Sequence, residues 1–330
     1  MAGGQERVLR RRIKSIQSTQ KITRAQELIA ASRIVRAQGR VHAAQPYSDS
    51  ITGVVADLAR GGGGLSSALL VPRPEVRRVA HIVVAADRGL CGAYNSNVLR
   101  TAEAAIAEDL AAGREYSLIT TGRKAEAYFR YREYTIDASF SGFSDAPTYE
   151  DARAVGRAAA QAFLAGETDL VEIIYTRFVS AGVQVVERQT LVPMVPPEVA
   201  ADGAGGASAA GVAASYEFEP SPDTILDLLL PRYVESRVFA ALLNASASEH
   251  ASRQRAMKSA TDNAGDLIIS LSRVMNRARQ DSITTEIMEI VSGAEALRSK
   301  KMKLVSDDFL ADDIEGRRQD LFEARAQSNS

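Results

Sequence analysis

The residues best suited to chemistry lie in one short turn, residues 87–92, with the sequence DRGLCG. Asp87, Arg88 and Cys91 place an acid, a base and a thiol directly after an apolar run, where open α/β sheets usually bind ligands. A cysteine nucleophile needs a nearby general base, and no histidine is close in the sequence. Three interpretations stay open from the residues alone: a catalytic turn, a structural turn and a protein-contact loop.

Other parts of the sequence offer little chemistry. The three histidines, His42, His81 and His250, are far apart and have no ligand spacing, so we expect surface or packing roles for them. A single cysteine excludes a thiolate zinc site and an internal disulfide. Neither GxGxxG nor GxxxxGK[ST] occurs, and the nearest sequence, TGRK at 121–124, lacks the first glycine and the final Ser or Thr. The sequence therefore predicts no catalytic residue, no metal and no cofactor.

The elements around the turn alternate between strand and helix patterns. We expect strands at 79–86, 116–121, 170–178 and 184–191, and helices at 95–112, 123–132 and 149–164. This alternation predicts a small, parallel-leaning sheet with helices on its faces. An Ala- and Gly-rich stretch at 198–215 predicts a mobile surface loop, and residues 216–220 alternate like a short edge strand.

Both ends of the chain are long, proline-free helical patterns. Residues 232–297 would form a helix of roughly 100 Å, which is too long for a compact domain to enclose. Residues 5–45 repeat the pattern, and Pro46 with the glycines at 61–64 marks the exit from this helix. Apolar residues recur at spacings of three and four, as in a coiled-coil seam: Leu9, Ile13 and Ile16 in the first run, and Leu267, Leu271, Val274, Ala278, Ile283, Ile287, Ile290, Ala294 and Leu297 in the second. The two ends are therefore expected to pair as an antiparallel coiled coil whose outer surface meets another component.

The net charge of −1 hides an asymmetry. Residues 1–45 carry ten Lys or Arg against Glu6 and Glu27, whereas residues 46–231 carry 15 basic and 24 acidic residues. The basic run is either a solvated helix face or a surface for an acidic partner or a nucleic acid. Two rival functions follow, a basic coiled-coil adaptor that binds nucleic acid and a small α/β enzyme that uses Cys91. No aromatic residue interleaves with the basic ones, which disfavours single-stranded nucleic acid.

Nothing in the sequence predicts insertion into a membrane or secretion. No run approaches 18 apolar residues, and the N-terminus lacks the apolar segment of a secretory signal. We therefore expect a bacterial chain that stays in the cytoplasm.

Three stretches together resemble the gamma-subunit family of F-type ATP synthases. They read IKSIQSTQKITRAQELIAASR at 13–33, DRGLCGAYN at 87–95 and ITTEIMEIVSGAEA at 283–296. The last is preceded, in the order that the family has, by YVESRVF and KSATDNAG at 233–239 and 258–265. The resemblance covers about 290 residues and implies a Rossmann-like α/β domain at the foot of a long antiparallel coiled coil.

The resemblance also implies a function and partners. The coiled coil would be the central rotor shaft, which transmits torque between a proton-driven c-ring and the catalytic hexamer of alpha and beta subunits. ATP would be made on the beta subunits, so this chain would be a non-catalytic subunit, present in one copy per complex. The foot would bind the epsilon subunit and the c-ring, which would associate the chain indirectly with the cytoplasmic face of the cell membrane.

Individual contact residues are implied by the same resemblance. Contacts with the beta subunit would come from Lys21, Arg24, Gln26, Arg88, Cys91, Arg279, Gln280 and Thr284, and contacts with the c-ring and epsilon from Tyr216 and Glu219. Gln26 and Leu28 stand where the family commonly has methionine, so this contact is expected to be more polar here. The paired cysteines of the chloroplast form are absent, so thiol regulation is not expected.

The predicted domain organisation has four parts. The long helices occupy 1–60 and 231–297, the α/β foot occupies 61–230, and 298–330 form a charged, solvated tail that is partly helical at most. The tail continues past the usual family end, at the apex of the hexamer. We hypothesise that it passes out of the apical opening, or folds within it, and limits rotation in one direction.

Overall fold

The computed structural model describes residues 2–60, 69–194 and 222–327. The predicted loop at 198–215 and edge strand at 216–220 lie outside these residues. The chain divides into two compact units, Lys21–Asp262 and a second unit formed by Met1–Gln20 with Asn263–Ser330. Each unit is described by itself. No helix in the described part of the chain is long and apolar enough to cross a membrane.

Two long helices, α1 and α6, contribute to both units. Helix α1 spans Ala2–Arg60 and continues through Pro46, which was expected to mark the exit from this helix only together with the glycines at 61–64. A proline removes one backbone hydrogen bond, but the turns beyond it are held by the buried side chains of Ile51, Val55 and Leu58. Helix α6 spans Pro222–Gln327 and begins before the predicted residue 231. Its first residue is a proline, which is favoured at that position because it has no N–H to leave unpaired.

The sheet lies in the unit Lys21–Asp262 and has five strands in the order β3-β2-β1-β4-β5. Their bounds are Arg78–Val84 for β1, Glu115–Thr121 for β2, Ala138–Phe140 for β3, Leu170–Phe178 for β4 and Gln184–Val192 for β5. Strand β1 pairs in parallel with β2 and β4, β2 pairs in parallel with β3, and β4 pairs antiparallel with β5. The predicted parallel-leaning sheet is confirmed, whereas the short strand β3 was not predicted.

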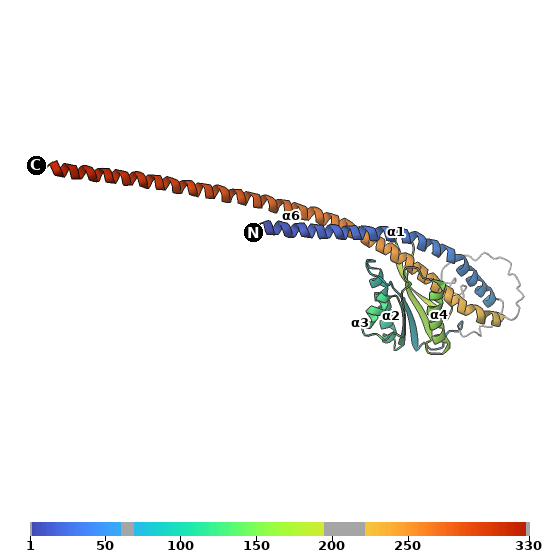
Figure 1. The fold of residues 1–330 in the computed structure, drawn as a ribbon. Coiled ribbons are helices and arrows are strands. Elements are labelled where there is room, and N and C mark those ends of the chain that lie inside the picture. The colour runs from blue at the N-terminus through green and yellow to red at the C-terminus, as the bar shows by residue number, and fades with distance from the viewer. Residues whose placement is uncertain (1, 61–68, 195–221, 328–330) are drawn as a thin grey trace. The chain divides into compact units, whose positions relative to one another are not determined.

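Helices cover both faces of this sheet (Figure 1). Helices α2, Tyr94–Ala111, and α3, Arg123–Tyr131, pack on one face, and helix α4, Tyr149–Leu164, packs on the other with the first turns of α6. Alternate residues of β1 pack into two hydrophobic cores, one on each face of the sheet. Ile82 and Val84 face α4 and α6, while Val83 faces α2 and α3. This period of two is that of a strand buried on both sides.

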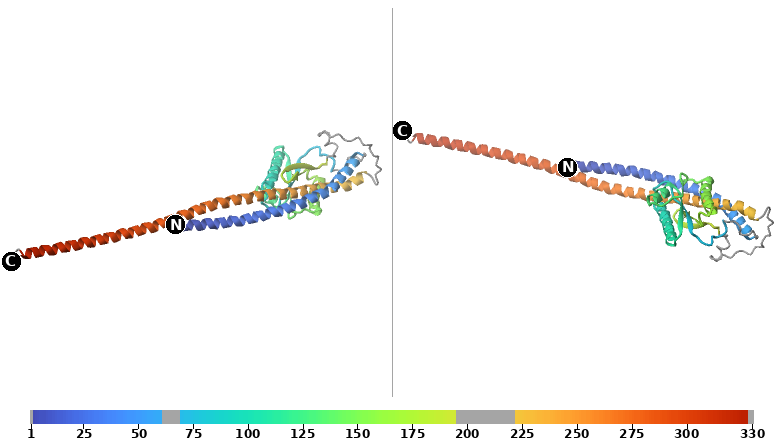
Figure 2. Two further views of the ribbon diagram at one scale, coloured as in Figure 1. Left: turned by 90° about the horizontal axis from the view of Figure 1, so that it is seen from above. Right: turned by 90° about the horizontal axis from the view of Figure 1, so that it is seen from below.

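In Figures 1 and 2, α1 and α6 lie side by side and run in opposite directions. In the unit with the sheet, the hydroxyl groups of Thr23 and Thr261 are 2.7 Å apart, and Ala30 and Ala37 are buried. In the other unit Ile13 is buried, and an added Cβ at Gly265 would lie 3.3 Å from Nε2 of Gln20. Small and polar residues therefore fill much of the seam, as the sequence predicted.

The predicted seam is wrong at Leu267 and Val274, which are 52% and 48% exposed, and over its last five residues, from Ile283 to Leu297. Ile283, Ile287, Ile290 and Leu297 are 48%, 54%, 66% and 72% exposed. Since Gln20 lies against Gly265 and α1 begins at Ala2, α1 ends near the level of roughly residue 283 of α6. Beyond that level, no helix in the described part of this unit covers the apolar stripe of α6.

The structure also differs from the sequence prediction after residue 297. Helix α6 continues to Gln327, where a tail that is partly helical at most was expected. Residues 298–327 contain no proline and only one glycine, Gly316, and most of the others are good helix formers. Local propensity is thus consistent with an unbroken helix.

The sheet core contains a buried histidine that predicts a pH dependence of stability. His81 of β1 is fully buried, with Nε2 2.7 Å from Oδ2 of Asp109 and Nδ1 3.4 Å from Oε2 of Glu172. Burial lowers the pKa of His81 and outweighs the opposing effect of the two carboxylates. As the pH falls through about 6.5, His81 is therefore protonated in the unfolded chain but stays neutral in the folded chain. We expect the free energy of unfolding to fall as the pH drops from about 6.5 toward the pKa of the folded state.

Urea unfolding at pH 7.5 and 5.5 measures this effect. The chain should lose about 1 kcal/mol more than the variant His81→Gln over this interval. Comparing the chain with this variant cancels the contribution of the titratable groups that both proteins contain. Equal losses in the two proteins would show that folded His81 takes up the proton as readily as the unfolded chain.

Candidate functional site

The turn after β1 is held by one carboxylate. Oδ1 of Asp87 accepts a hydrogen bond from the backbone N–H of Arg123 at 3.1 Å, and Oδ2 accepts from the N–H groups of Gly142 and Ser144 at 2.9 and 3.1 Å. Burial disfavours its ionised form, but these donors outweigh burial and lower the pKa of Asp87. Asp87 therefore ties the turn to the two loops that follow β2 and β3, which is a positioning role.

The tip of the turn projects an apolar side chain. Leu90 is 67% exposed and has a φ of 61°, a left-handed backbone conformation that residues other than glycine rarely adopt. The preceding carbonyl oxygen, that of Gly89, accepts hydrogen bonds from Nε and Nη2 of Arg253 at 3.4 and 3.3 Å. The turn is thus built to hold Leu90 outward.

Cys91 lacks the properties of a nucleophile. It is 2% exposed, its Sγ accepts a hydrogen bond from Nδ2 of Asn95 at 3.1 Å, and burial raises the pKa of its thiol. A thiol with a raised pKa is inert at neutral pH, because the thiolate is the reactive form. The geometry therefore gives no support to an enzyme that uses Cys91.

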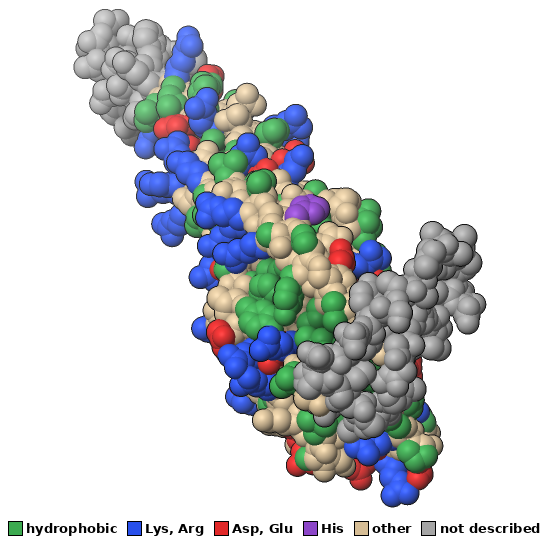
Figure 3. Space-filling view, turned by 90° about the vertical axis from the view of Figure 1, so that its right-hand side faces the viewer, with side chains coloured by type: hydrophobic (Ala, Val, Ile, Leu, Met, Phe, Trp, Pro, Cys, Tyr) green, Lys and Arg blue, Asp and Glu red, His purple; other side chains and the backbone are tan. Residues whose placement is uncertain are grey.

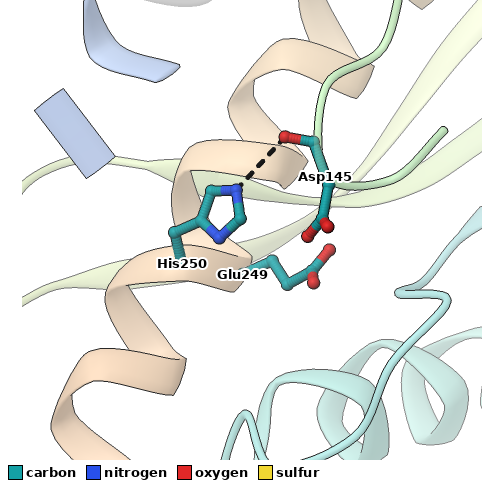
Figure 4. Close-up of side chains that lie close together, drawn as sticks. All are labelled: Asp145, Glu249 and His250. Atoms are coloured by element: carbon teal, nitrogen blue, oxygen red, sulfur yellow. Dashed lines mark hydrogen bonds between the residues drawn. The ribbon is translucent and has the colours of Figure 1, made fainter. Parts of the chain in front are cut away.

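Behind the turn lies a cluster that the sequence analysis missed, formed by the half-buried Asp145 and the buried Glu249 and His250 (Figure 4). Oδ2 of Asp145 accepts a hydrogen bond from Arg33 of α1 at 2.6 Å. Oε1 of Glu249 accepts one from Arg253 of α6 at 2.6 Å, and Nε2 of His250 lies 3.2 Å from the backbone oxygen of Asp145. The only local signal in the sequence is an acid and a base four residues apart, Glu249 and Arg253, in a small, apolar stretch of helix.

The cluster has three ligand atoms within 4.8 Å of one another, but its chemistry does not suit a metal ion. His250 uses Nε2 toward the Asp145 carbonyl and has Nδ1 3.4 Å from Nη1 of Arg253, so neither nitrogen is free. Arg33 and Arg253 already neutralise the two carboxylates. Burial and the nearby Asp145 raise the pKa of Glu249. The cluster is better suited to holding a proton and joining α1, α6 and the loop after β3.

The structure brings together two of the residues implied as beta-subunit contacts. Gln26 of α1 and Arg88 of the turn line one cavity of about 190 Å³, with Leu90, Asp145 and His250 among the other lining residues. Arg88 is exposed, and its guanidinium lies 3.7 Å from Oδ2 of Asp145. This part of α1 and the tip of the turn therefore form one surface.

The remaining predicted contact residues are dispersed. Lys21 and Arg24 are exposed on α1, and Arg24 donates to both carboxylate oxygens of Glu27. Arg279, Gln280 and Thr284 are exposed on α6, in the other unit. Tyr216 and Glu219 lie outside the described residues. Figure 3 shows Lys and Arg side chains gathered along one edge of the face in view, with few acidic side chains among them.

Comparisons with known proteins agree with this architecture. A family model described as ATP synthase matches residues 5–297. The ATP synthase gamma chain of Parafrankia sp. is 49% identical over 300 residues, which are 90% of this chain and 99% of the relative. That of Mycobacterium tuberculosis is 46% identical over 304 residues, which are 88% and 97% of the two chains.

Solved structures share the fold. A chain of the Euglena gracilis mitochondrial ATP synthase superposes with a TM-score of 0.64 at 18% identity and covers 91% of this chain and 96% of its own length. A chain of the central stalk and c-ring of the Tetrahymena thermophila mitochondrial ATP synthase has a TM-score of 0.55 at 23% identity. The match covers 72% of this chain and 99% of the Tetrahymena chain. From its sequence relatives and the matched family model, the chain belongs to the ATP synthase gamma-chain family.

Proposed function

We propose that this chain is the central rotor shaft of an F-type ATP synthase, where it transmits torque between a proton-driven c-ring and a catalytic hexamer of alpha and beta subunits. The observation that carries the proposal is the match to gamma chains over nearly their whole length, at up to 49% identity. The chain itself would be non-catalytic, in agreement with the buried, inert thiol of Cys91. The inequality of its two paired helices, α1 and α6, supports the role, because unequal contacts can bias three equivalent subunits toward different states.

The contact residues that we propose for the beta subunits lie in both units. Lys21, Arg24, Gln26 and Arg88 belong to the unit with the sheet, and Arg279, Gln280 and Thr284 lie on α6 in the other unit. In the unit with the sheet, the exposed tip of the turn at Leu90 adds to these contacts, whereas Cys91 is buried and supports the turn from inside. Exposed ion pairs are individually weak, which suits a surface that slides past successive partners. The foot would bind epsilon and the c-ring through Tyr216 and Glu219, at the cytoplasmic face of a bacterial membrane.

Reversing charge on this surface tests the proposal. The variant Lys21→Glu/Arg24→Glu, introduced into the complete complex, should lower ATP-driven proton pumping by about threefold, because two weak attractions become repulsions. Arg36 and Arg40 are also exposed on α1 but are not proposed contacts, so Arg36→Glu/Arg40→Glu is the matched control. Equal rates of proton pumping by the two variants would rule out the proposed contact. Failure of the tagged chain to co-purify with nucleotide-binding subunits would rule out the proposed function.

The nucleic-acid adaptor has only the basic face of α1 in its favour. Salt-sensitive binding of the chain to duplex DNA would support it. The family membership favours the shaft instead.

The segment after residue 297 is an addition to the family pattern. The family model ends at residue 297, while α6 continues to Gln327. Under the proposed function this segment lies at the tip of the shaft, and we propose that it limits rotation in one direction. Deleting residues 298–330 should therefore change the ratio of ATP hydrolysis to ATP synthesis in membrane vesicles. An unchanged ratio, with both rates intact, would show that the segment has no regulatory role.

A further inference from the structure

Two carboxylates of the cluster behind the turn lack a hydrogen-bond donor on the side where they meet. Oε2 of Glu249 and Oδ1 of Asp145 are buried atoms that have no hydrogen-bond partner in the part of the chain that the structure describes. Figure 4 shows the two carboxylates pointing toward each other, and an oxygen of one lies within 4.8 Å of an oxygen of the other. Buried acceptors without a donor are costly, so this pair indicates a bound species that donates a hydrogen bond.

The other oxygen of each carboxylate is held by an arginine. Oε1 of Glu249 accepts a hydrogen bond from Arg253 of α6, and Oδ2 of Asp145 accepts one from Arg33 of α1, both at 2.6 Å. Burial raises the pKa of Glu249, and the charge of Asp145 adds to this rise. Arg253 and the hydroxyl of Ser144 oppose the rise but do not cancel it. Glu249 therefore takes up a proton at a higher pH than an ordinary glutamate.

The charged and titratable groups around the pair come from several elements. They are Arg253 and His250 on α6, Arg33 on α1, Arg88 and Cys91 in the turn after β1, and Tyr94 of α2. Burial lowers the pKa of His250 and raises the pKa of the Cys91 thiol and the Tyr94 hydroxyl. These three groups are therefore neutral in weakly acidic solution, and the pair of carboxylates is the group that can take up a proton there.

The space beside Glu249 is too small for most donors. The cavity that this residue lines has a volume of only about 10 Å³, which is at the lower limit for one water molecule. A proton needs no volume of its own. All residues of the cluster belong to the unit Lys21–Asp262.

We propose that Asp145 and Glu249 share one proton, through which Oε2 of Glu249 donates a hydrogen bond to Oδ1 of Asp145 and fastens α6 to the loop after β3. The proton binds in weakly acidic solution and leaves as the pH rises, so the bond is a pH-sensitive latch. The neighbouring residue, Ser144, exchanges hydrogen bonds with Asp87, whose carboxylate holds the turn after β1. The latch therefore acts directly beside that turn. This inference is independent of the rotor function, because it concerns a property of the chain alone.

Infrared spectroscopy of the purified full-length chain detects the proton directly. Exposed carboxyl groups are almost fully ionised at pH 6, so a protonated carboxyl group that absorbs at this pH has to be a perturbed one. We expect one such band at pH 6 and its disappearance by pH 8. Both Glu249→Gln and Asp145→Asn should lack the band at pH 6, because each removes one of the two oxygens that hold the proton.

Urea unfolding at pH 5 and 7.5 measures whether the proton stabilises the fold. The unfolded glutamate has a pKa of about 4.3, so the stabilisation by the shared proton is present at low pH and is lost as the pH rises through the higher pKa of the folded state. The folding equilibrium constant of the natural chain should fall by about fivefold over this interval, relative to either variant. The opposite effect of His81 is common to all three proteins and cancels.

The matched control is Glu150→Gln, which removes an ion-paired glutamate whose side chain is 75% exposed. This variant should keep both the infrared band and the pH dependence of the natural chain. Absence of the band from the natural chain at pH 6 overturns the proposal, and this measurement needs no substitution, so it decides even where a variant fails to fold. A band that survives Asp145→Asn but not Glu249→Gln also overturns it, because Glu249 then holds the proton alone.

Discussion

The variant Gly122→Ala is expected to lose at least about 4 kcal/mol of unfolding free energy or to fail to fold. Gly122 follows β2 and has a φ of 89°. A Cβ added there would lie 2.2 Å from the carbonyl oxygen and 2.8 Å from the carbonyl carbon of Ala85. These are backbone atoms of the segment after β1, so relief requires β1 and β2 to separate. Urea unfolding, or the yield of soluble chain where no transition is found, measures the loss.

Gly113 provides the matched control. It also has a positive φ, of 75°, but an added Cβ would meet no atom within 4 Å. Gly113→Ala should therefore lose only the unfolding free energy that a left-handed conformation costs a residue other than glycine, about 1–2 kcal/mol. If the two variants lose equal stability, the close approach at Ala85 is not what requires glycine at position 122.

The second large effect concerns the buried pair beneath the turn. Arg253→Met should destabilise the chain by about 3–5 kcal/mol, because it leaves the carboxylate of Glu249 buried without its cation. Glu249 is 1% exposed, and Oε1 is 2.6 Å from Nη2 of Arg253. The substitution also removes the hydrogen bonds to the carbonyl oxygen of Gly89. Urea unfolding at pH 7 measures the loss.

The double variant Glu249→Gln/Arg253→Met separates the charge from the packing. With no carboxylate left to desolvate, it should be more stable than Arg253→Met alone, by about 2 kcal/mol. A double variant as unstable as the single one would show that Arg253 acts through the turn at Gly89. That outcome would shift the explanation from the ion pair to the hydrogen bonds.

Several elements of the foot could be predicted from the sequence because their signals are local. The bounds of α4 and β4 agree with prediction, and the other predicted strands and helices differ by one or two residues at their ends. Each of these elements is at least seven residues long, which is enough for a strand or helix pattern to be read from the sequence. Strand β3 has only three residues, Ala138–Phe140, which is too short for such a pattern. It forms because β2 offers a free edge.

The cluster behind the turn could not be predicted because its members come from distant parts of the chain. Arg33 and Asp145 are 112 residues apart, and Asp145 and His250 are 105 residues apart. Each residue alone is an ordinary charged or polar residue of a helix or loop. Only the packing of α1 and α6 against the loop after β3 buries Glu249 and His250 and joins these distant residues in one network.

The sequence by itself determined the family of this protein, the alternation of strands and helices in its foot, and the pairing of its two ends. Three short motifs in the right order and the local periods of apolar residues were enough for these conclusions. The tertiary structure decided how far that pairing extends, because α1 ends near roughly residue 283 of α6 and leaves the apolar stripe beyond it exposed. It also decided that the turn DRGLCG presents Leu90 and buries Cys91. Exposure depends on which distant segments pack over a residue, and a local pattern carries no information about them.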